Sequence, residues 1–159
     1  MLNSSLKTGL SFGLTSGIIT TLGLLVGLAA GTSSRLAVLG GILTIAIADA
    51  FSDALGIHVS EEAENNHTHS EVWQSTFATF FAKFFFAMTF AIPVFIFDLK
   101  TATIISVIWG FIILTIANFF IARSGKIAPW KVISEHLLIA AVVVIASYFV
   151  GNLISTFLS

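Results

Sequence analysis

Two aspartates, Asp49 and Asp53, lie four residues apart inside a long apolar stretch of this 159-residue chain. In an α-helix this spacing places both carboxylates on one face. An ionised carboxylate at the centre of a bilayer costs about 2.5–3.5 kcal/mol on insertion scales, so a cation, a proton or a counter-charge must offset it. The pair therefore indicates a functional site, and the alternative is a structural polar contact or a permanently protonated acid.

A lysine in a later apolar stretch is one candidate for the counter-charge. Lys83 lies ten residues after Trp73, about 15 Å along a helix, which is the depth expected for Asp49. One interpretation is a fixed ion pair of Lys83 with Asp49 or Asp53 that holds helices together. The other is that the ammonium satisfies the carboxylates only while the site is empty and leaves when a cation or proton arrives. The residues leave both interpretations open.

Further carboxylates and imidazoles follow the aspartates in the polar segment 60–72, which contains no lysine or arginine. Divalent cations are expected to accumulate there. Imidazole with carboxylate suits first-row metals such as Fe²⁺ and Mn²⁺, whereas Ca²⁺ and Mg²⁺ prefer oxygen alone. The candidate metal ligands are Asp49, Asp53, His58, Glu61, Glu64, His67 and His69. Their spacing matches no defined motif, and a solvated acidic loop is the alternative.

The composition determines the class of protein that carries these residues. The chain is 57% hydrophobic and 9% charged, with a mean hydropathy of +1.02, and this is too little charge to wet the surface of a soluble domain. The net charge of −1 excludes nucleic acid as the main partner. Without cysteine the chain has no disulfide, zinc–thiolate site or iron–sulfur cluster, and no prosthetic group is expected. The protein is therefore expected to be a multi-pass membrane protein.

Five apolar stretches are long enough to cross a hydrocarbon core of about 30 Å. They cover residues 10–30, 36–59, 73–97, 102–122 and 132–157, in a single transmembrane domain of residues 1–159 that contacts the lipid bilayer. Because they are continuously apolar rather than alternating, they predict helices and an all-α fold.

The orientation follows from the distribution of basic residues. An odd number of spans places the termini on opposite sides, and the more basic side is cytoplasmic. The N-terminal side holds Lys7, Arg123, Lys126 and Lys131, against Arg35 and Lys100 on the other. This predicts a cytoplasmic N-terminus and a cytoplasmic linker at 60–72.

Glycines recur every fourth residue in the first span, at Gly9, Gly13 and Gly17. Small residues at this spacing let helix backbones approach closely in a membrane. The glycines predict either a seam between two copies of the chain or packing against helices of the same subunit.

Several short stretches carry a family resemblance when taken in order. In the first two spans they are Gly17-Ile18-Ile19-Thr20-Thr21 with Val26-Gly27, Ala48-Asp49-Ala50-Phe51-Ser52, and Gly56-Ile57-His58-Val59-Ser60. Later stretches are Trp73-Gln74-Ser75, Pro129-Trp130-Lys131, Leu137-Leu138-Ile139 and Tyr148-Phe149-Val150-Gly151. Their order, spacing and span count resemble the vacuolar iron transporter family over nearly the whole chain. The resemblance implies a five-helix homodimer that moves Fe²⁺ or Mn²⁺ out of the cytosol in exchange for protons, with the first spans facing each other.

The resemblance also implies roles for individual residues. A two-fold axis would bring together two copies each of Asp49 and Asp53 as an oxygen-rich site, with Ser16 and Thr20 as neutral ligands. Protons or Lys83 would neutralise this site when it is empty.

The chain departs from the family pattern at three places, one of which is Gly56-Ile57-His58 where the family has Gly-Glu-Tyr. Thr15-Ser16-Gly17 stands where the family has Asn-Asp-Gly, so the first-span carboxylate is missing, and Ser52-Asp53 stands where the family has Ser-Met. We expect Asp53 and Asp49 to replace the missing charge, and the lost thioether to weaken discrimination of Fe²⁺ from harder cations such as Mn²⁺. The helical metal-binding domain of many relatives is reduced to the 60–72 linker.

The sequence thus predicts a proton-coupled exporter of divalent transition metal in the cell membrane. The alternative is a family member that no longer transports and serves as a structural or metal-sensing membrane protein, with Lys83 locked to the aspartates. No catalytic residue is expected, because Gly-x-Ser-x-Gly and His-Glu-x-x-His motifs are absent.

Overall fold

The described part of this computed structural model, residues 4–125 and 128–158, is helical throughout apart from short turns. The elements are α1 (Ser4–Thr32), α2 (Arg35–Thr44), the π-helical turn η1 (Ile45–Asp49), α3 (Ala50–Glu64), α4 (His69–Thr89), α5 (Ala91–Ile96), α6 (Leu99–Gly125) and α7 (Pro129–Leu158). Lys126, used in the orientation argument, lies outside the described residues.

These elements form five helices that are long and apolar enough to cross a membrane. The element α2 continues through η1 into α3, and α4 continues into α5. The five helices are Ser4–Thr32, Arg35–Glu64, His69–Ile96, Leu99–Arg123 and Pro129–Phe157. The predicted all-α fold with five spans is confirmed. Every helix is longer than its predicted apolar stretch, because polar residues at the ends continue the backbone hydrogen bonding.

The connection between α3 and α4 is much shorter than the linker predicted at 60–72. The helix α3 runs to Glu64, Asn65 adopts a left-handed conformation with a φ of 53°, and α4 begins at His69. Thr68 and Glu71 form a capping box: the Glu71 N–H donates to the Thr68 hydroxyl at 3.3 Å, and the Thr68 N–H donates to the Glu71 carboxylate at 2.9 Å. The linker prediction was wrong because these polar residues extend or cap helices.

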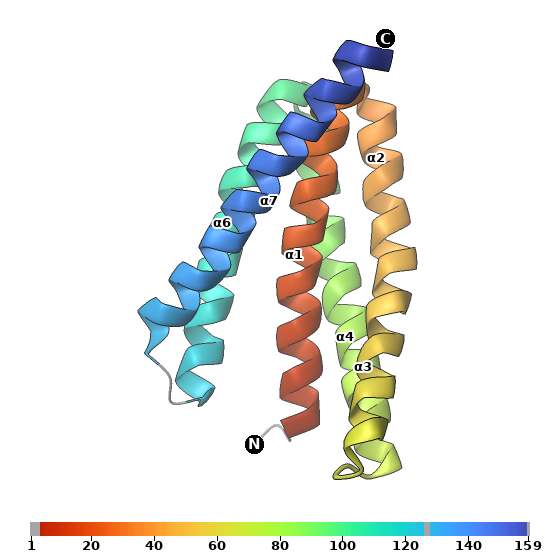
Figure 1. Cartoon of the computed structure of the whole chain (residues 1–159), viewed down its shortest axis with the longest axis vertical. Helices are drawn as coiled ribbons and strands as arrows, with labels where there is room; N and C mark the ends of the chain where they lie inside the picture. Colours follow the sequence, from red (N-terminus) through yellow and green to blue (C-terminus); the bar gives the residue numbers. More distant parts are fainter. Residues whose placement is uncertain (1–3, 126–127, 159) are drawn as a thin grey trace.

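The helix α1 occupies the middle of the molecule (Figure 1), where it packs against α4 on one side and α7 on the other. Its buried residues Ile18, Leu22 and Leu25 form the centre of the hydrophobic core. The α6–α7 hairpin stays close to α1 near the C-terminus and leans away from it toward the end that holds the N-terminus (Figure 1).

The glycines of α1 pack inside the chain. A Cβ at Gly9 would overlap the backbone of Ser75, and one at Gly13 would overlap that of Thr79. At Gly17 it would lie 3.1 Å from Lys83 Cα. Of the two alternatives that the glycine spacing left open, the structure has packing within the same subunit, because α4 fills that face.

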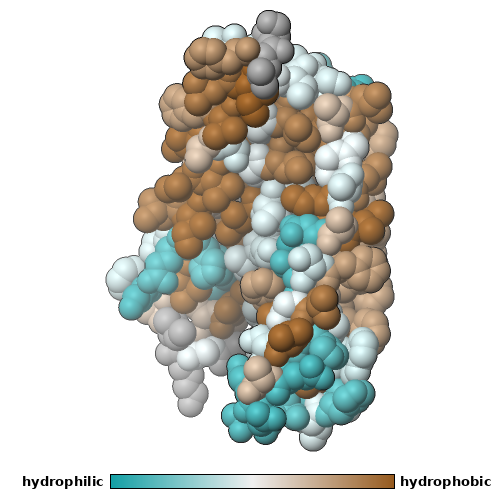
Figure 2. Space-filling model, turned by 45° about the vertical axis from the view of Figure 1, so that its right-hand side comes forward, coloured by the Kyte–Doolittle hydropathy of each residue, from teal (hydrophilic) through white to brown (hydrophobic). Residues whose placement is uncertain are grey.

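Most of the outer surface is apolar. Hydrophobic side chains cover much of the face shown in Figure 2, and hydrophilic residues gather at the end where α3 turns into α4. Large exposed side chains such as Phe51, Phe85 and Phe149 are each about 60% exposed, as expected of residues that contact lipid. The protein is a multi-pass integral membrane protein.

Candidate cation site

Lys83 lies near the middle of its span and is buried, with 1% of its surface exposed. Its Nζ donates hydrogen bonds to Asp53 Oδ2 and, at 3.0 Å, to Ser16 Oγ. The same Nζ lies 2.5 Å from Asp49 Oδ2. One ammonium therefore contacts both aspartates, so the two pairings that the sequence left open occur together.

Ser16 connects α1 to this cluster. Its hydroxyl donates to Asp53 Oδ2 at 2.6 Å and accepts from Lys83. Thr20, one turn further along α1, donates instead to the carbonyl of Ser16 at 2.8 Å. Of the two hydroxyls implied as neutral ligands, Ser16 contacts a carboxylate, whereas Thr20 forms a hydrogen bond within its own helix.

The charges of the cluster do not balance. Two ionised carboxylates and one ammonium leave a formal charge of −1 at the middle of the spans. Among the described residues, no further cation pairs with either aspartate. Asp49 Oδ2 is close to Nζ but is not aligned for a hydrogen bond, and it is buried without another partner. The negative charge of the cluster, and the Asp49 Oδ2 atom that accepts no hydrogen bond, therefore suit the binding of a proton or a cation.

The backbone that presents the aspartates is unusual. The π-helical turn η1 ends at Asp49, and α3 begins at the next residue. Single π-turns inside α-helices are rare and often occur at functional sites, since they change the direction of the following side chains. The alanines at 46, 50 and 54 are buried, and their small side chains bring this helix close to its neighbours. Both carboxylates therefore reach the Nζ of Lys83.

The other predicted metal ligands lie at the end of the molecule and form separate pairs. His58 Nδ1 is 2.9 Å from Thr76 Oγ1, and its Nε2 is 3.4 Å from Glu62 Oε1. His67 Nδ1 is 3.1 Å from Ser5 Oγ, and its Nε2 is 3.4 Å from Glu64 Oε2.

His69 and Glu61 are also apart from these pairs. His69 Nε2 accepts a bond from the Trp73 indole at 3.3 Å, and Glu61 is 5% exposed with its Oε2 buried and without a hydrogen-bond partner. Within the described ranges, no three acidic, histidine or cysteine residues come together as a metal site. His58 therefore connects α3 to α4 and His67 connects the turn to α1, whereas His69 bonds within α4.

Sequence reasoning missed Thr76, Ser5 and the π-turn. No periodicity indicates that a threonine on α4 or a serine at the start of α1 contacts a histidine, because such pairs depend on how helices rotate against each other. The Gly9, Gly13 and Gly17 repeat was the available signal for the close α1–α4 contact.

The match to a known family covers the helices that hold both aspartates. A family model described as the VIT family matches residues 10–72. The chain is therefore similar to the VIT family over this segment, which is less than half of its 159 residues. The match confirms the vacuolar iron transporter resemblance for residues 10–72, and this family suggests metal-ion transport. Searches of curated proteins and of solved structures found no match.

The segment that matches the VIT family contains Ser16, Asp49 and Asp53, and Lys83 lies outside it. The lysine therefore enters the site from a helix that the family model does not match, and its role rests on the geometry alone.

Proposed function

We propose that this protein, which is similar to the VIT family over residues 10–72, exports a divalent transition metal, Fe²⁺ or Mn²⁺, from the cytoplasm in exchange for protons. The observation that carries the proposal is the unbalanced negative charge of the cluster formed by Asp49, Asp53 and Lys83. Such a charge is costly within a bilayer unless a proton or cation neutralises it. The cytoplasmic N-terminus and a location in the cell membrane belong to the same proposal.

The charge of a divalent cation, compared with the charges that neutralise the empty site, favours exchange of the cation for a proton. In the empty state, the Lys83 ammonium and one proton together neutralise the two carboxylates. A divalent cation carries the charge of that ammonium and proton combined, so it can replace both if the lysine moves away. Lysine suits this step because its ammonium is a point charge on a flexible stem. The carboxylate oxygens, with the Ser16 hydroxyl, form a donor set that suits Mn²⁺ at least as well as Fe²⁺.

A homodimer is part of the proposal, and the exposure of the aspartates supports it. The side chains of Asp49 and Asp53 are 30% and 20% exposed, near the middle of the span. An ionised carboxylate is not stable against lipid at that depth, so another protein surface or water must cover it. Beside the aspartates runs an exposed row of small residues at four-residue spacing: Gly40, Thr44, Ala48, Ser52, Gly56 and Ser60.

This row suits close contact with a second copy. A Cβ at Gly40 or Gly56 would meet nothing within 4 Å, and small residues in a row allow helices to pack closely in membranes. A two-fold axis along this face would add a second pair of aspartates to the site.

Metal flux into proteoliposomes tests the proposal. Fe²⁺ and Mn²⁺ are supplied in turn across an imposed pH gradient, and uptake is expected to follow the gradient. Asp53→Asn and Asp49→Asn are each expected to abolish this flux while leaving a folded protein. Asp98→Asn, which changes an exposed carboxylate between spans, is the matched control and should transport normally. Undiminished flux in both site variants would refute the site.

The second candidate function is a structural or metal-sensing protein that does not transport. The burial of Lys83 and its three contacts favour it, because a permanently docked ammonium would block a divalent cation. This candidate predicts no flux of either metal from a folded protein, and Lys83→Met would then destabilise the protein without changing any ion selectivity.

A further inference from the structure

The gap between α1 and α6 contains two connected grooves at the end of the molecule that holds Lys7. The outer groove has a volume of about 470 Å³ and the inner one of about 390 Å³. They share four lining residues, Leu10, Ser11, Phe120 and Ile121. The gap exists because the α6–α7 hairpin leans away from α1 at this end (Figure 1).

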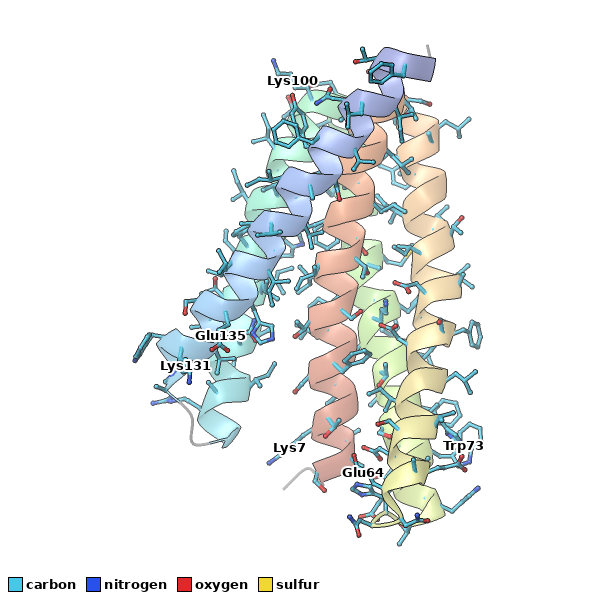
Figure 3. All side chains as sticks on the ribbon, viewed as in Figure 1. Lys7, Glu64, Trp73, Lys100, Lys131 and Glu135 are labelled. Carbon is cyan, nitrogen blue, oxygen red and sulfur yellow. The ribbon has the colours of Figure 1, made fainter. Side chains whose placement is uncertain are left out.

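The outer groove adds polar groups and a positive charge to an otherwise apolar lining. Its lining includes Lys7 and the hydroxyl residues Ser4, Thr8 and Ser11, and no aspartate or glutamate is among the described residues that line it. Lys7 is exposed, and in Figure 3 it points away from α1 on the side of the α6–α7 hairpin. Within the described part of the chain, Lys7 forms no ion pair with a carboxylate.

The inner groove is apolar. Leu14, Phe86, Trp109 and Ile113 are among its lining residues, and they come from α1, α4 and α6. Leu14 lies seven residues beyond Lys7, or about 10 Å deeper along the helix axis. The two grooves therefore place an uncompensated ammonium with hydroxyl groups above a hydrocarbon-lined channel.

We propose that this pair of grooves binds an anionic phospholipid. The head-group phosphate lies at Lys7 and the neighbouring hydroxyls, and one acyl chain follows the inner groove past Ser11. The positive charge of Lys7 favours an anionic head group. The apolar inner groove below it favours a ligand with an attached hydrocarbon chain over a free anion. The site is separate from the Asp49–Lys83 cluster, so it does not depend on the proposed transport.

Lipid retention by the purified protein tests this site. The protein is equilibrated with equal amounts of phosphatidylglycerol and phosphatidylcholine, and the lipids that stay bound are counted by native mass spectrometry. The wild-type protein is expected to retain more phosphatidylglycerol than phosphatidylcholine. Lys7→Gln should reduce that preference about fivefold, the effect of one basic residue at an anionic lipid surface. Lys131→Gln removes the same charge at the same end (Figure 3) but outside the grooves, and should keep the preference.

A second variant tests the inner groove. Ser11→Phe should obstruct the junction of the two grooves and lower retention of both lipids, with Ser11→Leu as a milder replacement if the first variant does not fold. An equal loss of preference in Lys7→Gln and Lys131→Gln would overturn the proposal, as would an unchanged preference in Lys7→Gln. Displacement by inorganic phosphate would indicate a site for a free anion. Unchanged lipid retention with a changed oligomeric state in Ser11→Phe would assign the groove to a second copy. Either of these last two results also overturns the proposal.

Discussion

Gly17 of α1 lies directly against Lys83 of α4, and a Cβ built on the glycine would be 3.1 Å from the lysine Cα and 3.2 Å from its Cγ. This close approach brings Ser16, the neighbour of Gly17, within hydrogen-bonding distance of the lysine ammonium. The position of the charged cluster is thus a consequence of a glycine contact between two helices.

The first prediction concerns this helix contact. Gly13→Ala should destabilise the protein by about 1–3 kcal/mol, the usual cost of overpacking, because its Cβ would overlap the backbone of Thr79. Gly56→Ala, whose Cβ meets nothing within 4 Å in the chain, should be neutral or slightly stabilising within a single chain because alanine favours helix, so any loss at this position would come from the proposed contact with a second copy. Thermal unfolding in detergent measures both. Equal losses in both variants would show that the Gly56 face is also tightly packed.

The second prediction concerns Lys83. Lys83→Met leaves Asp49 and Asp53 without their ammonium and should cost about 3–5 kcal/mol of stability, as for other broken buried ion pairs. Adding Asp49→Asn and Asp53→Asn to Lys83→Met removes the uncompensated charges and should restore most of the loss. Thermal unfolding of the single and triple variants measures the difference. If the single variant is as stable as the wild type, the ion pairs do not hold the helices together.

The third prediction separates the two hydroxyls of α1. Ser16→Ala removes a bond to Asp53 and should cost about 1.5–3 kcal/mol, the range for hydrogen bonds to charged groups, and should slow metal flux. Thr20→Ala removes a bond to its own helix backbone and should change flux little. Flux and unfolding measured on the same preparations test the pair. Slower flux in Thr20→Ala than in Ser16→Ala would show that Thr20, and not Ser16, contributes its hydroxyl to the cation site.

The fourth prediction concerns the histidines at the end of the molecule. His67→Ala with His69→Ala should leave the flux of Fe²⁺ and Mn²⁺ unchanged, because these imidazoles bond to Ser5 and Trp73 and are not part of a group of metal ligands. The double variant should be less stable, since His67 connects the α3–α4 turn to α1. Loss of flux in a folded double variant would instead support the hypothesis that the α3–α4 turn binds metal before transport.

The fifth prediction concerns pH and Asp98, which lies between two spans. Hydrogen bonds from Thr101 hold the pKa of Asp98 below its ordinary value, and the Thr101 N–H donates to Oδ1 at 3.0 Å. A lowered folded-state pKa gives stability that is complete above the unfolded-state pKa of about 4 and is lost as the pH falls through the folded-state value.

The stability difference between the wild type and Asp98→Ala should therefore be constant above about pH 5 and shrink below about pH 4. Thermal unfolding across this range measures it. A difference that grows toward acid would contradict the lowered pKa.

The sequence by itself determined the all-α class, the five spans, and the matching depth of the aspartate pair and Lys83. Hydropathy and helical periodicity are local properties, so they place Asp49, Asp53 and Lys83 at the middle of their spans without reference to any other helix. The four-residue spacing of the α1 glycines likewise predicted a close contact between helices.

Only the tertiary structure decided which groups meet. The sequence left open whether Lys83 pairs with Asp49 or Asp53, and the ammonium contacts both. It left open the partner of the α1 glycines, which is α4 of the same chain. It offered His58, His67 and His69 as metal ligands, and the structure places each against a different partner. Such contacts depend on the rotation and crossing of packed helices, and residues far apart in the sequence determine these together.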